Sequence, residues 1–401
     1  TAWLVEDRNL PVVSLAWAWG GGAALDPEGR EGRAGMAAAL LSEGAGDLRA
    51  NAFSDSLRDA GIGLGFGAGR DGFEGSFRSL SDALPEALRL ARLAMTAPRL
   101  DADAIDRVKA RAVRAAQQAQ ETPPGLARRA FWEAAFPGHP AGRLSTPESL
   151  AAVTEAELRA GLAQQLRQGG GLGGLLVTAS GDIDAAGLRA AMAQLFEGLP
   201  PGAPPAVPPL PAMARFGTVR REKAAGQSTL LFGQDALAPE DADWEAFQVA
   251  LRILAGGGFT SRLTRIVREE RGLTYGIGAG MDLLFGRAIV TGQVQTDNAT
   301  VGEVWQLVRG AWAQMASEGP TEAEVADAVA FLGGSLPLQF TDSRRTASLL
   351  LGLRQAGRSP EWLAGRGARL AALTRGEVAS AARRLQPEAL GLAVAGEPQG
   401  L

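Results

Sequence analysis

The chain has 401 residues, 46% of them apolar, which is enough to bury the cores of two or three domains. Its net charge of −4 and its scattered arginines exclude the basic stripe that nucleic-acid-binding proteins carry. With no cysteine and a single histidine, His139, the chain lacks the residues for disulfides, thiol chemistry and the usual zinc sites. No apolar run approaches the roughly 20 residues that span a bilayer.

The first half of the chain predicts an alternation of strands and helices. Apolar runs at 3–5 and 12–19 indicate two early strands, and a third strand is expected at 72–80. Amphipathic patterns and acidic first turns then predict helices. The expected elements are helices at 84–95, 101–120 and 122–135, a helix pair within 145–166, and a buried strand at 174–180.

A proline-rich segment at 199–211 divides the sequence almost in half. Its seven prolines forbid a helix and favour an extended, semi-rigid spacer. We therefore predict an N-terminal domain at 1–198, a linker at 199–211 and a C-terminal domain at 212–401.

The second half repeats the order of elements of the first. A strand is expected at 288–295, helices at 301–315, 321–332 and 342–355, a helix pair within 360–385, and a closing strand at 390–395. A short segment repeats as well: P-E-S-L-A-A-V-T-E-A-E-L is echoed by G-A-R-L-A-A-L-T-R-G-E-V. The sequence predicts an α+β fold of two homologous halves, each a sheet packed against helices, which together form a clam-shell with a cleft.

Several motifs along the chain resemble one protein family. They are L-V-E-D-R-N-L-P-V-V from Leu4, G-R-A-G-M-A-A-A-L-L-S-E-G-A-G from Gly32, F-P-G-H-P-A-G-R-L-S-T-P-E-S-L from Phe136, and L-A-G-G-G-F-T-S-R-L-T-R-I-V-R-E-E-R-G-L-T-Y-G from Leu254. In these segments the chain resembles the pitrilysin or insulinase-type metallopeptidases, the inverzincins. It is most similar to short bacterial members related to the mitochondrial processing peptidase.

The resemblance breaks down at the zinc site. Active members carry H-x-x-E-H on the first long helix, where two histidines hold zinc and the glutamate activates water. Gly35, Ala38 and Ala39 stand at those three positions here. The third ligand, a glutamate, belongs on the helix at 101–120, which has no acid between Arg107 and Gln120. The resemblance thus implies no metal or cofactor in this chain and no peptidase activity of the chain alone.

A second part of the family's site is retained. The helix-like run at 261–271 ends at Gly272, and Tyr275, the only tyrosine, is expected to open the next strand. The resemblance implies that Arg268 and Tyr275, seven positions apart, grip the peptide backbone and the oxyanion. Both side chains are hydrogen-bond donors near neutral pH. The alternative is that Arg268 is one of several solvated helix arginines and Tyr275 a wall of the core.

A glycine-rich loop lies just upstream, formed by Gly256, Gly257, Gly258 and Phe259. The resemblance implies a substrate-contacting loop in this region. The alternative is a flexible break between two helices.

Two other candidates are weaker. His139 lies in F-P-G-H-P, which predicts a turn or surface histidine rather than a catalyst. Residues 67–72 spell G-x-G-x-x-G, but no helix is expected after them, so a dinucleotide site is improbable.

Two functions remain open. The chain is either the non-zinc subunit of a heterodimeric zinc metallopeptidase, or a catalytically inert scaffold similar to the core proteins of respiratory complex III. In the first case the partner is a homologous subunit that bears H-x-x-E-H and the zinc. Retention of the Arg268–Tyr275 pair favours the first function. By resemblance, a periplasmic location is expected.

Overall fold

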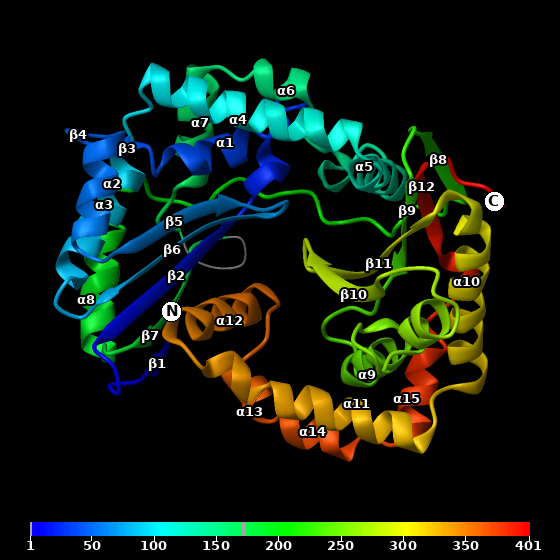
Figure 1. Ribbon diagram of the computed structural model, residues 1–401. Coiled ribbons are helices and arrows are strands. Elements are labelled where there is room, and N and C mark those ends of the chain that lie inside the picture. Colours follow the sequence, from blue (N-terminus) through cyan, green and yellow to red (C-terminus); the bar gives the residue numbers. More distant parts are fainter. Residues whose placement is uncertain (1, 170–173) are drawn as a thin grey trace. The chain divides into compact units, whose positions relative to one another are not determined.

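The computed structural model describes residues 2–169 and 174–401 (Figure 1). The chain divides into two units, and each contains a five-stranded sheet packed against helices. Each unit includes a segment from the opposite half of the sequence. The boundary between their longest parts falls after Pro208, within the predicted proline-rich segment. Unit 1 comprises the chain up to Gln117, Leu144–Pro208 and Pro337–Arg358; unit 2 comprises Gln118–Arg143, Pro209–Leu336 and Ser359–Leu401.

Unit 1 contains the first sheet, a small two-stranded ribbon and the helices that pack on them. The strands are β1 (Ala2–Glu6), β2 (Val12–Gly20), β3 (Gly44–Ala45), β4 (Leu48–Arg49), β5 (Gly63–Ala68), β6 (Gly72–Leu80) and β7 (Leu176–Gly181). The helices are α1 (Arg33–Leu40), α2 (Ala50–Asp59), α3 (Leu84–Thr96), most of α4 (Ala102–Glu121), α6 (Pro147–Ala151), α7 (Glu155–Gln165), α8 (Ala185–Leu195) and α12 (Ser343–Gln355).

Unit 2 contains the second sheet and its helices. The strands are β8 (Thr218–Glu222), β9 (Gln227–Asp235), β10 (Ile277–Leu284), β11 (Arg287–Asp297) and β12 (Gly391–Gly396). The helices are α5 (Pro123–Ala135), α9 (Trp244–Ala255), α10 (Val301–Glu318), α11 (Glu322–Ser335), α13 (Pro360–Ala364), α14 (Arg366–Ala372) and α15 (Arg375–Ala382).

The two sheets have the same strand order. The first runs β1-β7-β2-β6-β5 and the second β8-β12-β9-β11-β10. In each, the edge strand β1 or β8 pairs in parallel with the last strand of its half, and the other pairs are antiparallel. This repeat confirms the predicted α+β class and the two homologous halves. The expected helix pair at 360–385 is three helices, α13, α14 and α15, because capping side chains at Ser359 and Thr374 begin α13 and α15 separately.

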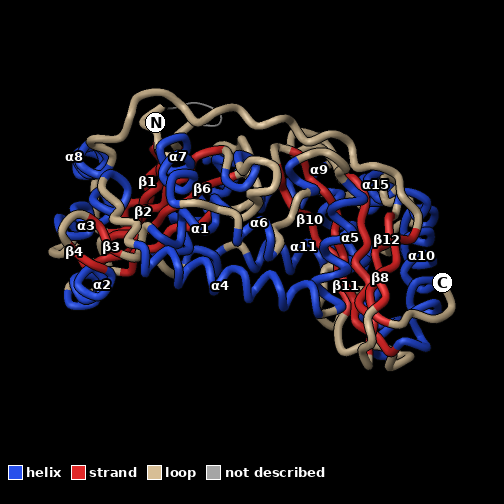
Figure 2. The backbone as a smooth tube through the Cα atoms, turned by 90° about the horizontal axis from the view of Figure 1, so that it is seen from above, coloured by secondary structure: helices blue, strands red, loops and turns tan. Residues whose placement is uncertain are grey.

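The two exchanged helices, α5 and α12, pack in different ways. In unit 2, α5 lies against β8, β9 and β12 (Figure 2), and the ring of Phe131 occupies the space above Gly233. In unit 1, α12 lies against β1, β2 and β7 through small residues and hydrogen bonds. Thr178 Oγ1 donates to the Ala347 carbonyl at 2.8 Å, and Ser14 Oγ lies 2.9 Å from Ser343 Oγ. The sequence predicts both helices but not the sheet that each one covers.

Each unit has its own apolar core. In unit 2 the rings of Phe232, Trp305 and Trp312 pack together beneath the sheet, with centroids 5.7 to 6.0 Å apart for the two contacts of Phe232. Among residues 2–169 and 174–401, no helix is long and apolar enough to cross a membrane.

A partly buried ion pair holds the segment after α9 against α11. Both nitrogens Nε and Nη2 of Arg262 donate to the carboxylate of Glu324 at 2.7 Å, and Nη2 also donates to the Gly319 carbonyl at 3.0 Å. Glu324 caps α11 too, because its carboxylate accepts the backbone N–H of Thr321. These bonds, chiefly those from Arg262, lower the pKa of Glu324 to about 2.

Phe131→Ala is expected to destabilise unit 2 by about 3–5 kcal/mol, since it leaves a cavity between α5 and β9. The side chain is fully buried and meets the ring of Phe216 edge-on at 5.7 Å. The midpoint of urea unfolding measures the effect. Phe331→Ala is the matched control, because this ring is half exposed and its loss should cost under about 1 kcal/mol. Equal midpoints for the two variants would contradict the assignment of α5 to the core of unit 2.

Glu324→Gln is expected to remove a pH-dependent part of the stability. Because the folded-state pKa is depressed from 4.5 to about 2, the ionised pair stabilises the native state above pH 4.5. This contribution, roughly 2–3 kcal/mol, is lost as the pH falls through the folded pKa. The wild-type minus variant difference in unfolding free energy should therefore be constant from pH 7 to about 5.5 and shrink below it. Glu322→Gln, an exposed change in the same helical turn, should show no such trend.

Candidate functional site

The segment that carries Arg268 is a π-helix, Thr264–Glu269, in place of the expected α-helix. Its widened turn shows in the hydrogen bond from the Glu270 N–H to the Arg265 carbonyl. Gly272 ends it as predicted, with a φ of +64° that favours glycine. π-helical turns occur frequently at functional sites, because they displace side chains from the regular helical positions.

Tyr275 lies in a bend two residues before β10, rather than at the start of the strand as expected. Two threonines tie its backbone to β11. Thr274 Oγ1 donates to the Gln295 carbonyl at 2.7 Å and accepts the Gly276 N–H at 3.2 Å. Thr296 Oγ1 donates to the Leu273 carbonyl at 2.6 Å. Since these bonds satisfy the polar backbone groups on both sides of Tyr275, the bend takes one defined course.

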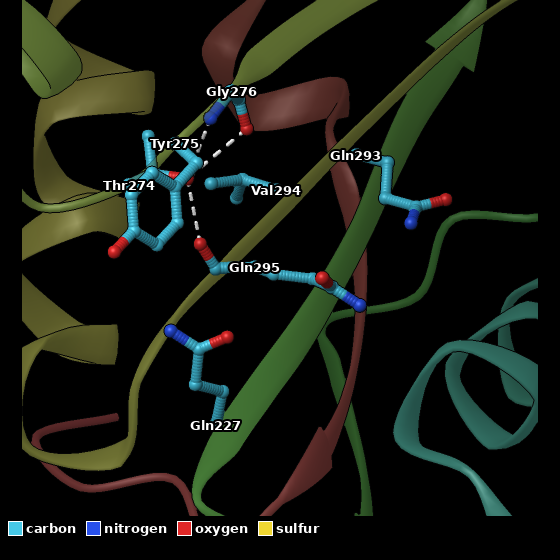
Figure 3. Close-up of a pocket in the computed structure, with 7 residues that line it drawn as sticks. All are labelled: Gln227, Thr274, Tyr275, Gly276, Gln293, Val294 and Gln295. Carbon is cyan, nitrogen blue, oxygen red and sulfur yellow. Dashed lines mark hydrogen bonds between the residues drawn. The ribbon is translucent and has the colours of Figure 1, made fainter.

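The ring of Tyr275 is 90% exposed, so the alternative that it forms a wall of the core is wrong. It borders a pocket of about 230 Å³ (Figure 3). Three glutamines line the same pocket, and their carboxamides supply donors and acceptors without charge. The lining residues are Gln227, Thr274, Tyr275, Gly276, Gln293, Val294 and Gln295.

The pocket faces outward from the sheet. Along β11, Val294 and Thr296 point into the core, whereas Gln293 and Gln295 point outward. Neutral hydrogen-bonding side chains beside an exposed phenol suit a peptide backbone better than a charged small molecule.

Arg268 is exposed, and its guanidinium lies over the ring of Phe259, 4.9 Å from the centroid. Within the part of the chain that the structure describes, it makes no ion pair. Its neighbour Arg265, by contrast, pairs with Glu270 at 3.5 Å. Stacking on an aromatic face leaves the in-plane N–H donors of the guanidinium available to a ligand.

The glycine-rich loop follows the end of α9 directly. Gly257 and Gly258 have φ values of +72° and +71°, which explains why residues without a side chain stand there. The end of α9 and the start of the loop lie close to β10, the strand after Tyr275. A Cβ built on Gly278 would lie 3.3 Å from the Ala255 carbonyl oxygen and 3.8 Å from the Gly257 nitrogen. Arg268, the glycine-rich loop and the Tyr275 segment are thus neighbours within unit 2.

The positions that the resemblance aligns with the two histidines and the glutamate of H-x-x-E-H lie on α1 in unit 1. Ala38 is packed into the core and only 1% exposed, Ala39 is half-buried, and Gly35 is exposed. None of the three offers a ligand atom, so these residues do not fit a zinc ion. A search of residues 2–169 and 174–401 finds no group of three or more His, Cys, Asp or Glu side chains able to hold a metal.

The start of α1 is held by a buried acid. Asp26 accepts the backbone N–H groups of Gly32 and Ala34 at 2.9 Å, and Arg33 Nε lies 3.4 Å from its carboxylate. Burial raises the pKa of Asp26 to about 6 in spite of these three interactions. The polar groups near α1 thus serve the helix start.

The two weaker candidates have structural roles. His139 lies in a turn, as predicted, but is buried, and its Nδ1 accepts the Ala141 N–H at 3.1 Å. Residues 67–72 form the turn between β5 and β6, with no helix after them, as expected.

Sequence reasoning did not find the three pocket glutamines or the two threonine anchors. The alternation in T-G-Q-V-Q-T-D of β11 carries a signal for Gln293 and Gln295, because polar residues at every second position of a strand share one face. Gln227 lies on β9, and only the register of the sheet brings it to the pocket.

Comparison with known proteins agrees with this description. Residues 175–332 match the family described as the peptidase M16 inactive domain. The non-peptidase homolog YmxG of Helicobacter pylori is 24% identical over 336 residues, which cover 83% of this chain and 77% of that protein. An uncharacterized zinc protease of Mycobacterium leprae is 26% identical over 229 residues, and this match spans 55% of the chain and 50% of the relative.

Solved structures extend the likeness over the whole chain. A peptidase M16 inactive domain from Pseudomonas fluorescens matches with a TM-score of 0.90 and 26% identity, covering 99% of this chain and 96% of that one. A chain of complex III2 from Candida albicans matches with a TM-score of 0.78 and 15% identity, covering 100% of this chain and 94% of that one. This is a likeness of fold alone. These matches agree with the resemblance to the pitrilysin-type metallopeptidases: residues 175–332 match the domain described as peptidase M16 inactive, and nearly the whole chain is similar in fold to a solved M16 inactive domain.

Proposed function

We propose that this chain is the non-zinc subunit of a heterodimeric zinc metallopeptidase and supplies Arg268 and Tyr275 to the partner's zinc site. The observation that carries the proposal is the exposure of Tyr275. The only tyrosine of the chain stands almost fully in solvent on a backbone that two threonine side chains tie to β11. An aromatic side chain displayed on a fixed backbone gains nothing for the core and is typical of a binding surface.

The chemistry of the pair suits a peptide bond under attack. The phenol of Tyr275 and the guanidinium of Arg268 are both donors, and a tetrahedral intermediate develops negative charge on the former carbonyl oxygen. Donors aimed at that oxygen stabilise the transition state more than the substrate. The carboxamides of Gln293 and Gln295 would hold the neighbouring peptide groups in place.

The proposal assigns the zinc and the attacking water to a partner that bears H-x-x-E-H. This division follows from the side chains on α1, where Gly35, Ala38 and Ala39 cannot bind a metal or act as a base. The zinc would supply Lewis-acid activation of the scissile carbonyl in the partner. This chain's own contribution is binding and orientation of the peptide and donation to the oxyanion.

The isolated chain is expected to bind no stoichiometric zinc and to cleave no peptide. Elemental analysis after dialysis against zinc measures the metal, and a zinc-bearing M16 relative purified alongside is the control. One tightly bound zinc per chain would contradict the reading of α1, whereas substoichiometric metal that chelator removes would not.

Co-expression with an H-x-x-E-H relative from the same genome is expected to give a stable 1:1 complex by size exclusion and light scattering. In that complex, Tyr275→Phe and Arg268→Ala should each lower turnover by about 100-fold or more at unchanged zinc content, because each removes one oxyanion donor. The double variant should lose less than the product of the two effects, since both donors serve one charge.

Arg265→Ala is the matched control, since this arginine is exposed on the same π-helix but faces Glu270. It should leave turnover within about threefold of wild type. If complexes that carry both Tyr275→Phe and Arg268→Ala keep wild-type turnover, the chain is a scaffold and not a contributor to the site.

A further inference from the structure

Two arginines and two exposed phenylalanines lie on either side of the glycine-rich loop. The guanidinium of Arg268 lies over Phe259, and that of Arg252 lies 3.7 Å from the centroid of Phe331. Phe259 is 67% exposed and Phe331 51%. We call these four residues the Phe–Arg surface.

The loop makes the Phe–Arg surface continuous. Arg252 Nη1 donates to the Gly256 carbonyl at 2.5 Å. Its Nη2 also lies close to Gly258, 3.8 Å from where a side chain on that residue would begin. Phe259 is the next residue. The Arg252–Phe331 contact on α9 and α11 is therefore adjacent, through the loop, to the Phe259–Arg268 contact.

The charge of the Phe–Arg surface is uncompensated. Most arginines of unit 2 that flank it have a carboxylate partner: Arg262 pairs with Glu324, and Arg271 with Glu303. Across the described ranges, Arg252 and Arg268 have none. Glu269, which follows Arg268, and Asp327, four residues before Phe331 on α11, are exposed and form no ion pair with either arginine.

A stacked guanidinium has a preferred ligand. The aromatic ring covers one face of the planar group, and the N–H donors project at its edge, where a carboxylate can accept two of them at once. The exposed ring beside it offers an apolar contact. Two such units side by side suit a segment in which acidic and large apolar side chains alternate, and they repel a basic segment.

We propose that the Phe–Arg surface binds acidic side chains of a peptide, next to a large apolar residue, and so gives this subunit a preference for acidic, apolar peptides. This inference rests on the proposed function in one respect, that unit 2 receives a peptide at the Tyr275 pocket. The continuity of the Phe–Arg surface with Arg268 favours the peptide as its occupant over the acidic surface of another protein.

Fluorescence anisotropy of the purified full chain with three labelled peptides tests the proposal without a partner or turnover. The peptides carry glutamate–phenylalanine–glutamate in a glycine–serine frame, the same sequence with glutamine for glutamate, and the same with lysine. The glutamate peptide should bind about tenfold more tightly than the glutamine peptide, and its advantage should shrink as salt rises. The lysine peptide should bind most weakly.

Variants locate the preference on the Phe–Arg surface. Arg252→Met keeps much of the packing and removes the charge, and it should bring the glutamate and glutamine peptides to within about twofold of each other. Phe331→Ala should weaken both peptides while keeping their ratio, because it removes the apolar contact alone. Arg309→Met, at an exposed arginine on α10 that is not part of the Phe–Arg surface, is the matched control and should change neither the affinities nor their ratio.

Equal affinity for the three peptides, or an acidic preference that survives Arg252→Met in a folded chain, would overturn the inference. It is also overturned if the substitution abolishes the complex with the H-x-x-E-H partner and leaves peptide binding unchanged, since the occupant would then be the partner. None of these results depends on whether Tyr275→Phe lowers turnover, so the proposed function is tested separately.

Discussion

The partly buried pair Arg262–Glu324 holds the segment that leads to Arg268 against the helix that carries Phe331. Arg262 begins the segment that leads into the π-helix with Arg268. Glu324 lies in the first turn of α11, and Phe331 lies about two turns further along the same helix. One carboxylate thus ties the two sides of the Phe–Arg surface together while it also caps a helix. Removal of either partner would leave a charge without compensation in a largely buried position, which is the costly way to break such a pair.

Tyr275 is exposed but stands on a backbone that hydrogen bonds hold in place. A side chain that protrudes into water is normally free to move, and ordering it at the moment of binding costs conformational entropy. Here Thr274 and Thr296 bond the two residues before the tyrosine to β11, and the Gly276 N–H after it donates to Thr274 Oγ1, so the backbone around Tyr275 is held in place. This arrangement reduces the ordering cost of binding without burying the phenol.

Sequence patterns were sufficient to predict the α+β class, the two homologous halves and most of the helices, because these features depend on local periodicity and capping. The two equal strand orders follow from repeated patterns of that kind. The exchange of α5 and α12 between the sheets was not predictable, since an amphipathic helix shows which face is apolar but not what covers it. The same holds for the site. Arg268 and Tyr275 were found through motif spacing, whereas the threonine anchors and the stacking of Arg252 on Phe331 depend on contacts between residues far apart in sequence.

The packing of α1 shows how far the zinc half of this chain has departed from a metal site. Ala38, at the position of the base, lies with Ala37 and Leu40 in the core of unit 1. A glutamate there would bury a carboxylate without a partner, and the α1 contacts would have to open to admit it. Restoring the glutamate at this position would therefore destabilise unit 1, whereas Gly35 is exposed and has open space where a side chain would begin. In unit 2, by contrast, the exposed tyrosine and two uncompensated arginines contribute little to stability. The proposed function would account for their arrangement, since a peptide held for a partner's zinc would contact these side chains.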